Sequence, residues 1–476
     1  MPCHDPNLFS RWTGGVWEGE PPDRVFGFSI DTREIREGEM FVAISTARRD
    51  GHRFLRDART KGAAAALVRE PDPRVDIPQL VVTDPVAALQ AMAARHRTHF
   101  HGPIVAVTGS CGKTSTKELL ALVLGEEGIH RNEGNLNNHL GVPLSLLGLD
   151  PERHRCGIVE IGINRPGEMS RLAALVQPDV VVVTTVGAAH LEGLESLDGV
   201  AAEKAALLDA LRSGGTAVFT ADCLRFKPFR EWRGDARIMV SPSAGDETVP
   251  APGGDNTFSL EPTGIPAGRD VGVEQVAWAF GSSDRSDLTI PRVSRGMRNN
   301  IALACAVAAC LGVDSGAYQE RLLRWRAAPF RGERLRIGAS DYYIDCYNAN
   351  PQSMIDSIEA FESMFPECSR MYVLGCMEEL GPSASEWHEW IGERLLLREG
   401  DAVILIGPYA ESYRDGIVRS GRSVRSVRVV EDLAEARTEL DGFRGAILLK
   451  GSRVYGLEAL LPENWRASAY GGRKVC

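Results

Sequence analysis

Thr-Gly-Ser-Cys-Gly-Lys-Thr-Ser, residues 108–115, lies between an apolar run, 104–107, and a helix-like segment, 116–124. A strand, a glycine loop and a helix in this order are what a phosphate-binding loop requires. Glycines let the backbone approach an anion, and the amide N–H groups at the start of the helix point towards it. Lys113 can neutralise the outer phosphates, and Thr114 can offer a hydroxyl to magnesium. We therefore predict a nucleoside triphosphate enzyme, against the alternative of a plain strand-to-helix turn.

The glycine spacing indicates a loop of a shorter type than usual. Gly109 lies three positions before Gly112, and Val107 stands where the usual loop has a glycine, five positions before the Gly-Lys pair. The residues expected to contact the phosphates are Gly109, Ser110, Gly112, Lys113, Thr114 and Ser115.

The composition is that of a soluble globular protein with more than one domain. The chain has 476 residues and a formal net charge of -10, so it lacks the basic character of a general nucleic-acid binder. No apolar run approaches the ~18 residues that span a bilayer, and the N-terminus lacks the pattern of a signal peptide. The 10 cysteines include no Cys-x-x-Cys pair, which favours reduced thiols in the cytoplasm over disulfides or a zinc ribbon.

The order of strand-like apolar runs and helix-like segments divides the chain into three α/β parts. Residues 1–101 predict a small α/β domain, with strands at 39–44, 64–68 and 79–82 and a helix at 85–96. His96, His99 and His101 stand at the end of that helix beside a Gly-Pro break, which favours a solvated linker over a metal site.

The second and third parts repeat the alternation of strands and helices. Residues 102–326 predict a central domain with a parallel sheet, from strands at 157–161, 180–184 and 216–219 and helices at 167–175 and 199–211. Residues 241–256, rich in Ser, Pro, Gly and Asp, predict a loop. Residues 327–476 predict a Rossmann-like domain without the dinucleotide glycine fingerprint, from strands at 342–344, 371–374, 402–406 and 446–449.

Three residues of the central part are candidates for chemistry. Glu160 ends an apolar strand after the phosphate loop, which favours a magnesium ligand over a helix cap or a surface acid. His190 follows the strand 180–183, so a metal or phosphate role and a structural role are both open. Lys204 lies on a helix-like segment, and its spacing alone indicates a surface lysine.

Two polar runs are open to a structural interpretation. Asn135, Asn137 and Asn138 could bind phosphate or sugar oxygens, although turn chemistry explains them as well. Tyr347-Asn348-Ala349-Asn350-Pro351 follows Asp345 at the end of a strand, where a turn and a helix cap are the alternative to a site.

Taken together, these pieces resemble the Mur ligase family almost from end to end. The Tyr-Asn-Ala-Asn-Pro element is typical of the branch that adds D-alanyl-D-alanine, and the Asp-Asn-Pro-Arg motif of the diaminopimelate- or lysine-adding branch is absent. The resemblance is carried by an ordered set of motifs: Ser29–Arg33, Gly38–Ala43, Asp50–His52, the phosphate loop, Gly134–Asn138, Gly141–Pro143, Glu160–Gly162, Asn164, Pro166–Glu168, Ala189–Glu192, Asp345, Tyr347–Pro351, Ser353, Met354, Gly375, Met377, Glu379–Gly381, His388 and Lys450–Arg453.

The resemblance implies a UDP-substrate domain, a central ATPase domain and a C-terminal dinucleotide-fold domain. It implies an ATP- and magnesium-dependent amide ligase of peptidoglycan precursor synthesis, acting in the cytoplasm as a monomer. The enzyme would join D-Ala-D-Ala to UDP-MurNAc-tripeptide through an acyl phosphate.

The resemblance also implies roles for individual residues. Lys113 would hold the outer phosphates, and Thr114 and Glu160 would hold one magnesium. His190 would help bind a second metal, at a site that a carbamoylated Lys204 would complete. Nucleotide contacts would come from Asn300, Arg334 and Asp345. Substrate contacts would come from Ser29, Thr32, Arg33, Asn135, Asn138, Tyr347, Asn348, Asn350, Lys450, Ser452 and Arg453.

The sequence departs from the family's pattern at a few positions. Ile344 stands where the first of two acids is usual, Cys376 where an Asp is usual, Arg165 where a His is common and Ala206 where an acid follows the lysine, and the Gly-x-His pattern reads Ser294-Arg295-Gly296. The rival interpretations are a ligase of the same superfamily with another acceptor and a non-catalytic nucleotide-binding protein. A P-loop kinase is a third alternative, which the short loop and the C-terminal domain disfavour.

Overall fold

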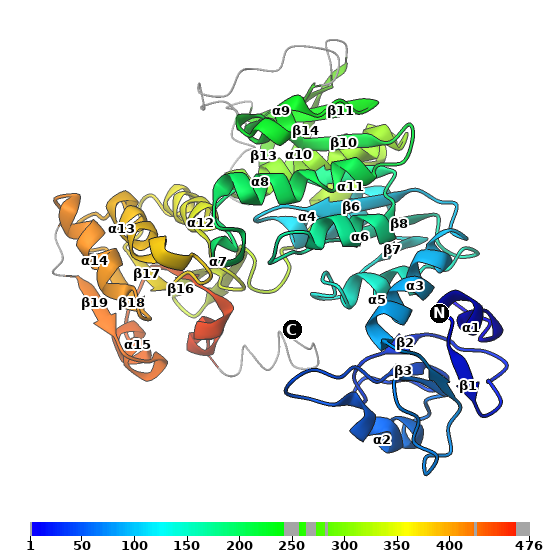
Figure 1. Cartoon of the computed structure of the whole chain (residues 1–476). Coiled ribbons are helices and arrows are strands. Elements are labelled where there is room, and N and C mark those ends of the chain that lie inside the picture. Colours follow the sequence, from blue (N-terminus) through cyan, green and yellow to red (C-terminus); the bar gives the residue numbers. More distant parts are fainter. Residues whose placement is uncertain (1, 242–256, 263–272, 281–283, 423–425, 463–476) are drawn as a thin grey trace.

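The chain builds three β-sheets, of five, nine and six strands (Figure 1). The computed structural model describes residues 2–241, 257–262, 273–280, 284–422 and 426–462. The sheets lie within residues 16–81, 104–291 and 333–450. The predicted three-domain α/β class is confirmed, whereas the domain boundaries after residues 101 and 326 stay a prediction. The expected loop 241–256 lies outside the described residues, apart from Ser241 at the end of a strand.

The N-terminal sheet is small and has the strand order β1-β5-β4-β3-β2. Strand β1 runs antiparallel to β5, and the remaining pairs are parallel. Helix α1 precedes this sheet, and α2 leads into β4. The bounds are α1 Asn7–Thr13, β1 Val16–Glu18, β2 Phe28–Ser29, β3 Met40–Val42, α2 Leu55–Thr60, β4 Ala65–Val68 and β5 Gln79–Val81.

Helix α3 (Pro85–Arg97) joins the N-terminal sheet to the central domain. Asp84 caps it by accepting the N–H groups of its first turn, and Pro85 occupies a position where no N–H is needed. At its other end His96 is buried, and its Nε2 donates to the carbonyl oxygen of Leu149 at 2.7 Å. The prediction that His96 lies in a solvated linker is therefore wrong, because the side chain is buried. Burial also lowers the pKa of this imidazole.

The central sheet has the strand order β14-β13-β12-β11-β10-β9-β6-β8-β7. Its strands run parallel from β7 to β12, and β13 and β14 add an antiparallel hairpin. Strands: β6 Ile104–Thr108, β7 Ile129–Arg131, β8 Cys156–Glu160, β9 Val180–Val183, β10 Thr216–Thr220, β11 Ala236–Ser241, β12 Thr257–Pro262, β13 Val273–Phe280 and β14 Asp284–Pro291. Helices: α4 Lys113–Leu124, α5 Gly141–Leu147, α6 Glu168–Val176, α7 Leu191–Leu194, α8 Leu197–Ala205, α9 Lys227–Glu231, α10 Arg295–Cys310 and α11 Ser315–Leu323.

Helices cover both faces of the parallel part of the central sheet (Figure 1). Val105 and Val107 pack with α4, α10 and α11, whereas Ile104 and Ala106 pack with α5, α6 and α8. Because neither face meets water, β6 is apolar at successive positions instead of alternating. The carboxyl ends of β6, β8 and β9 therefore open at one edge of a buried sheet, where ligands of such folds bind.

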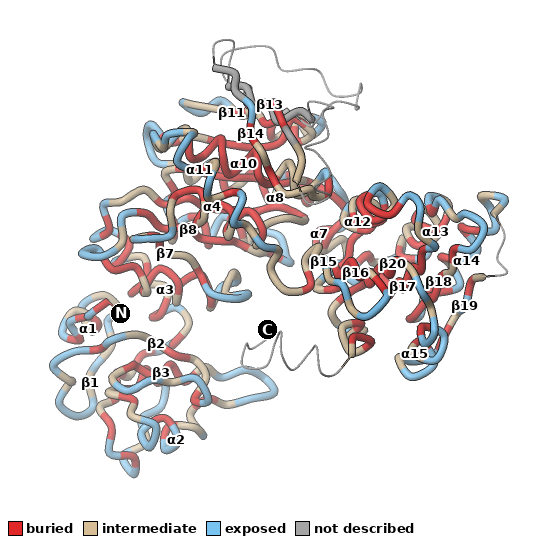
Figure 2. Tube along the Cα trace, turned by 180° about the vertical axis from the view of Figure 1, so that it is seen from behind, coloured by how far each residue is buried: buried red, intermediate tan, exposed pale blue. Residues whose placement is uncertain are grey.

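The C-terminal sheet has the order β15-β16-β20-β17-β18-β19 and is parallel except for β15. Helices α12, α13 and α14 pack on one face and α15 on the other, so its central strands are buried (Figure 2). The bounds are β15 Glu333–Ile337, β16 Ser340–Asp345, α12 Pro351–Met364, β17 Arg370–Gly375, α13 Ala384–Arg394, β18 Ala402–Ile406, α14 Ala410–Arg419, β19 Val427–Val430, α15 Leu433–Leu440 and β20 Ala446–Lys450.

Two further expectations can be compared with the structure. The cysteines from Cys3 to Cys376 are all free thiols. A search of the described residues finds no helix with the length and apolar character needed to cross a bilayer.

Candidate active site

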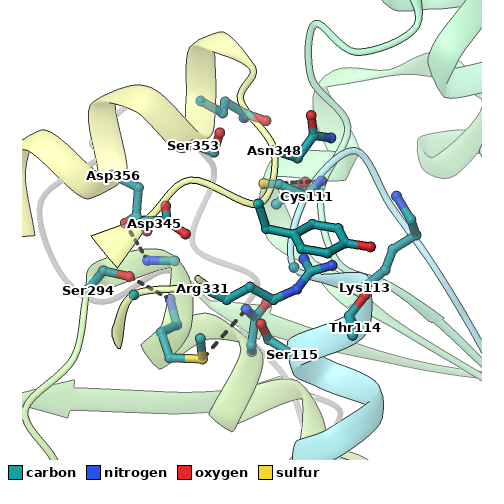
Figure 3. A pocket seen from close by; sticks show the side chains of 18 of the residues that line it. Cys111, Lys113, Thr114, Ser115, Ser294, Arg331, Asp345, Asn348, Ser353 and Asp356 are labelled. Atoms are coloured by element: carbon teal, nitrogen blue, oxygen red, sulfur yellow. Dashed lines mark hydrogen bonds between the residues drawn. The ribbon is translucent and has the colours of Figure 1, made fainter. Parts of the chain in front are cut away.

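A cavity of about 1110 Å³ lies where the edge of the central sheet meets the C-terminal domain. The phosphate loop, the start of α10, β15 and the turn between β16 and α12 all contribute to its lining. Figure 3 shows Lys113, Thr114 and Ser115 on one side of it and Asp345 and Asp356 on the other, with Arg331 extending between them.

The two glycines of the phosphate loop are required by its backbone. Gly109 has φ +150°, and a Cβ there would lie 1.8 Å from the hydroxyl of Thr184. Gly112 has φ +82°, and its Cβ would lie 2.6 Å from Oδ1 of Asn300. Gly112 is also the N-cap of α4 without any side chain capping the helix. The first N–H groups of a twelve-residue helix thus face the cavity, as in an anion site.

The loop is held against the end of β9. The N–H of Ser110 donates to the carbonyl oxygen of Thr185 at 2.9 Å, and its hydroxyl donates to the carbonyl oxygen of Gly187 at 2.9 Å. Lys113 folds back so that its Nζ donates to the carbonyl oxygen of Gly109 at 2.7 Å. Burial lowers the pKa of this amine. A phosphate offers the amine a stronger acceptor than this carbonyl.

Glu160 is buried at the end of β8 and faces the cavity. Its Oε1 accepts from Nδ2 of Asn137 at 2.8 Å, and its Oε2 has no hydrogen-bond partner. The nearest cation is Lys117, whose Nζ lies 3.6 Å from that Oε2 and donates to the carbonyl oxygen of Asn132 at 2.8 Å. A buried carboxylate oxygen left without a donor is a ready ligand for a cation.

These donors suit magnesium. Thr114 and Glu160 both line the cavity and carry side-chain oxygen atoms, and Mg²⁺ prefers oxygen ligands. Among the described residues, His, Cys, Asp and Glu nowhere gather in threes that could hold a metal by themselves. A magnesium ion here therefore needs the phosphate oxygens of the nucleotide, which is how such ions are usually held.

His190 meets a residue of the C-terminal domain. Its Nδ1 lies 2.5 Å from Oε2 of Glu379, and the hydrogen bond from the imidazole lowers the pKa of that carboxyl. Both residues have a left-handed backbone, with φ +56° and +61°. His190 also lines the cavity, so its ring faces the domain contact and the site at the same time.

Lys204 is buried inside the central domain, which the spacing of α8 did not indicate. Its side chain is 2 % exposed, and burial is the main cause that lowers the pKa of its amine to about 7. Repulsion from Lys113 lowers it further. At neutral pH a substantial fraction of this amine is therefore uncharged, which is the form that reacts with an electrophile.

The predicted nucleotide contacts lie around the loop. Asn300 packs on Gly112, and Arg334 lines the cavity from β15, where burial lowers its pKa. Asp345 is already engaged: its Oδ2 accepts from Ser357 at 2.5 Å and from Nζ of Lys450 at 2.7 Å. Nζ of Lys450 also donates to the carbonyl oxygen of Asn348, so this lysine braces the turn after β16.

The Tyr-Asn-Ala-Asn-Pro element links the two domains. Asn350 caps α12 in a capping box with Ser353, and its Nδ2 donates to the carbonyl oxygen of Ser110 in the phosphate loop at 3.2 Å. The guanidinium of Arg331 lies 3.8 Å over the ring of Tyr347. Asn350 therefore both caps a helix and contacts the phosphate loop.

The structure brings most of the predicted residues to one cavity. Those that line it are Ser110, Gly112, Lys113, Thr114, Ser115, Asn135, Asn138, Glu160, His190, Asn300, Arg334, Asp345, Tyr347, Asn348, Asn350 and Lys450. Those that lie outside its lining are Gly109, Lys204, Ser29, Thr32, Arg33, Ser452 and Arg453.

Four of the residues outside the lining, namely Arg33, Ser29, Arg453 and Ser452, have partners elsewhere. Arg33 pairs with Asp31 at 2.5 Å on the N-terminal sheet, and Ser29 donates to the carbonyl oxygen of Asp31. Arg453 pairs with Glu458 at 2.6 Å. The N–H of Ser452 donates to the carbonyl oxygen of Cys376 at 3.2 Å.

Sequence reasoning assigned no role to Lys117, Arg331, Asp356 and Glu379. Lys117 lies one turn after Lys113 in α4, a position that could have signalled a second cation near the loop. Glu379 belongs to a motif that was noted without a role. The contact of Asp356 with Gly296 crosses between domains, whereas Arg331 lies over Tyr347 within the C-terminal domain, and no local pattern signals either contact.

The departures at Ile344, Cys376 and Gly296 have structural explanations. Ile344 is fully buried among apolar side chains, and the thiol of Cys376 is buried with its pKa raised to about 12, so both pack inside the C-terminal domain. The N–H of Gly296 donates to Oδ1 of Asp356 at 2.6 Å, and a Cβ there would lie 2.7 Å from the other oxygen. Glycine thus leaves room for a contact between domains.

Three family models match the chain. They are the Mur ligase family catalytic domain over residues 24–97, the Mur ligase middle domain over 107–263 and the Mur ligase glutamate ligase domain over 331–453. The UDP-N-acetylmuramoyl-tripeptide–D-alanyl-D-alanine ligase of Escherichia coli is 31% identical over 91% of this chain and 92% of its own length. The protein of that name from Synechocystis is 31% identical over 92% of both chains.

Solved structures agree with these matches. The MurF structure from Acinetobacter baumannii superposes with a TM-score of 0.82 at 25% identity, covering 97% of this chain and 98% of its own. The MurF ligase from Thermotoga maritima, solved in complex with ADP, gives a TM-score of 0.75 at 27% identity, covering 91% and 96%.

Proposed function

This chain belongs to the Mur ligase family and is an ATP-dependent ligase, and we propose that it joins D-alanyl-D-alanine to UDP-MurNAc-tripeptide in peptidoglycan precursor synthesis. The observation that carries this proposal is the contact between the phosphate loop and the Tyr-Asn-Ala-Asn-Pro element, made by Asn350 and Ser110. It places the element typical of the D-alanyl-D-alanine-adding branch beside the loop that would hold the reacting phosphate.

The reaction needs ATP because a carboxylate is a poor acyl donor. An oxygen of the tripeptide carboxylate attacks the γ-phosphorus of ATP, ADP leaves, and an acyl phosphate forms. The amine of the dipeptide then attacks the carbonyl carbon, inorganic phosphate leaves, and the nitrogen loses a proton. Positioning and charge neutralisation carry most of the catalysis of such a phosphoryl transfer.

The residues on the phosphate-loop side of the cavity supply the positioning and the charge neutralisation. The N–H groups at the start of α4 bind phosphate oxygens, and Lys113 exchanges its bond to Gly109 for one to the outer phosphates. Magnesium, when held by Thr114 and Glu160 together with phosphate oxygens, supplies neutralisation of the charge on the transferred group. His190 faces the same space, and we assign it the carboxylate end of the tripeptide or a second metal.

Lys204 would join that set only after modification. Its amine is buried and has a pKa of about 7, so an uncharged fraction is available to react with carbon dioxide. Carbamoylation turns the amine into an anion, which relieves the repulsion from Lys113 and offers oxygen to a cation.

The C-terminal side would bind the nucleotide and the acceptor. Asn300, Arg334 and Asp345 surround the nucleotide position, and Tyr347, Asn348 and Lys450 shape the acceptor side. We place the uridine nucleotide on the N-terminal domain at Ser29, Thr32 and Arg33, from which the UDP-sugar extends to the cavity. Docking of the C-terminal domain then excludes water, which would hydrolyse the acyl phosphate.

The decisive experiment uses the purified chain with UDP-MurNAc-tripeptide, D-Ala-D-Ala and magnesium-ATP. We expect the mass of the amide product and one phosphate released per product. A panel of other acceptors serves as the comparison. Activity with a different amino acid and none with D-Ala-D-Ala would contradict the assigned acceptor, and ATP binding without turnover on any substrate would contradict a catalytic role.

We propose further that the enzyme acts in the cytoplasm, where ATP is available, and that it acts as a monomer. Light scattering of the eluting peak in size-exclusion chromatography measures the molar mass and tests the second statement. A mass of twice 51.8 kDa would refute it.

A further inference from the structure

Two side chains from different domains meet at the edge of the cavity. Nδ1 of His190, at the start of α7 in the central domain, lies 2.5 Å from Oε2 of Glu379, which follows β17 in the C-terminal domain. A backbone bond accompanies the pair, because the N–H of Glu192 donates to the carbonyl oxygen of Glu379 at 3.2 Å. The segment after β17 thus docks on the start of α7 through both main chain and side chain.

The backbone at this contact is strained on both sides. His190 and Glu379 have φ of +56° and +61°, a region that residues with a Cβ rarely adopt. Such conformations persist where the surroundings over-determine them, and they cluster at functional sites. Two left-handed residues that face each other across a domain contact indicate that their geometry serves more than packing.

The chemistry of the pair determines which ring nitrogen is free. A carboxylate offers only acceptors, so Nδ1 of His190 must carry the proton and donate it. In the neutral ring Nε2 is then the acceptor, on a side chain that lines the cavity. A carboxylate that binds the second nitrogen of a functional histidine fixes its tautomer and its orientation.

We propose that Glu379 is a positioning residue that fixes the tautomer and orientation of His190 only when the C-terminal domain is docked. The tautomer and the orientation of His190 are then fixed at the moment when the C-terminal domain docks. The Glu379 side chain is 52 % exposed, so the pair opens to water readily when the domains separate. The inference rests on the proposed function, in which His190 acts at the carboxylate end of the tripeptide, either directly or through a second metal.

The first test reads the imidazole directly, without substrate or metal. In protein labelled with ¹⁵N-histidine, the His190 signals are identified by their loss in His190→Gln. Spectra are recorded at a pH where the ring is neutral, and there we expect the proton on Nδ1 in the wild type and a mixture of tautomers in Glu379→Ala. The matched control is Glu378→Ala, because Glu378 is the adjacent residue and accepts from the hydroxyl of Tyr455 within its own domain at 2.5 Å.

The second test is a double-mutant cycle on kcat with saturating ATP. Loss of a group that orients a functional histidine typically costs about 10–100-fold, and we expect this fall in kcat for Glu379→Ala, with the KM for ATP changed much less. His190→Gln should cost far less in the Glu379→Ala background than alone. Glu378→Ala should stay within about twofold of the wild type, and far-UV circular dichroism verifies that each variant is folded.

The outcomes separate this inference from the proposed function. Unchanged His190 spectra in Glu379→Ala, or independent multiplying effects in the cycle, would refute the positioning role and would mean that the contact is only an exposed hydrogen bond. A wild-type enzyme that makes no D-alanyl-D-alanine product would instead refute the proposed function, and the spectra would still decide the tautomer question.

Discussion

Replacing Lys117 with methionine tests the buried charge pair behind the phosphate loop. The side chains of Lys117 and Glu160 are 1 % and 2 % exposed, and 3.6 Å separates Nζ from Oε2. Removing one partner of a buried pair costs about 3–5 kcal/mol, because the other charge stays buried without compensation. The carbonyl oxygen of Asn132 loses its 2.8 Å donor as well. We therefore expect Lys117→Met to lower the free energy of unfolding by about 3–5 kcal/mol.

The matched control is Lys227→Met, because Lys227 is 73 % exposed and lies 3.9 Å from Glu231. It should cost less than about 0.5 kcal/mol. Urea titration measures both variants, and hydrogen exchange in β8 reports the central domain separately from the others. The double variant Lys117→Met, Glu160→Gln should be more stable than Lys117→Met alone, because no charge is left unpaired. Equal costs for the two lysine variants would refute the reasoning.

Four further predictions follow from the geometry of the site. Gly112→Ala should abolish binding of ATP, measured by calorimetry, because Gly112 has φ +82° and the new Cβ would meet Asn300. The control is Gly214→Ala, where φ is +78° but the Cβ would meet open space, so the backbone should be strained while ATP binds normally. In buffer free of carbon dioxide, stability should rise between about pH 7 and pH 10.5, because the unfolded state binds the Lys204 proton that the folded state has lost. Lys204→Met should remove that rise, on the order of 4–5 kcal/mol, in urea titrations at each pH. Lys204→Ala should lose most activity and recover part of it with short carboxylates, whereas Lys227→Ala should not respond. Asn350→Ala should destabilise α12 by about 1 kcal/mol in thermal unfolding and weaken ATP turnover, because the cap and the bond to the loop are lost together.

The sequence was informative wherever short-range chemistry decides the structure. An apolar run, two glycines and a Lys-Thr pair predicted the β6–loop–α4 unit, since a backbone that must approach an anion needs glycine at Gly109 and Gly112. Apolar runs of four or five residues predicted the parallel strands, because helices cover both faces. The hairpin β13–β14 was missed, since its antiparallel pairing adds to the sheet edge without the alternation of strand and helix on which the prediction rested.

Burial and long-range contact were decided only by the tertiary structure. The sequence predicted a surface lysine at Lys204 and assigned no role to Lys117, yet Lys117 is buried beside Glu160 and the amine of Lys204 has a pKa of about 7. Glu379 lies 189 positions from His190, and no spacing rule connects them. Residue types and local spacing determine which groups are available and which segments become strands, helices or glycine turns. Which groups lose their water, and which meet across a domain contact, depends on how those segments pack, because desolvation and Coulomb energy are properties of the assembled surroundings.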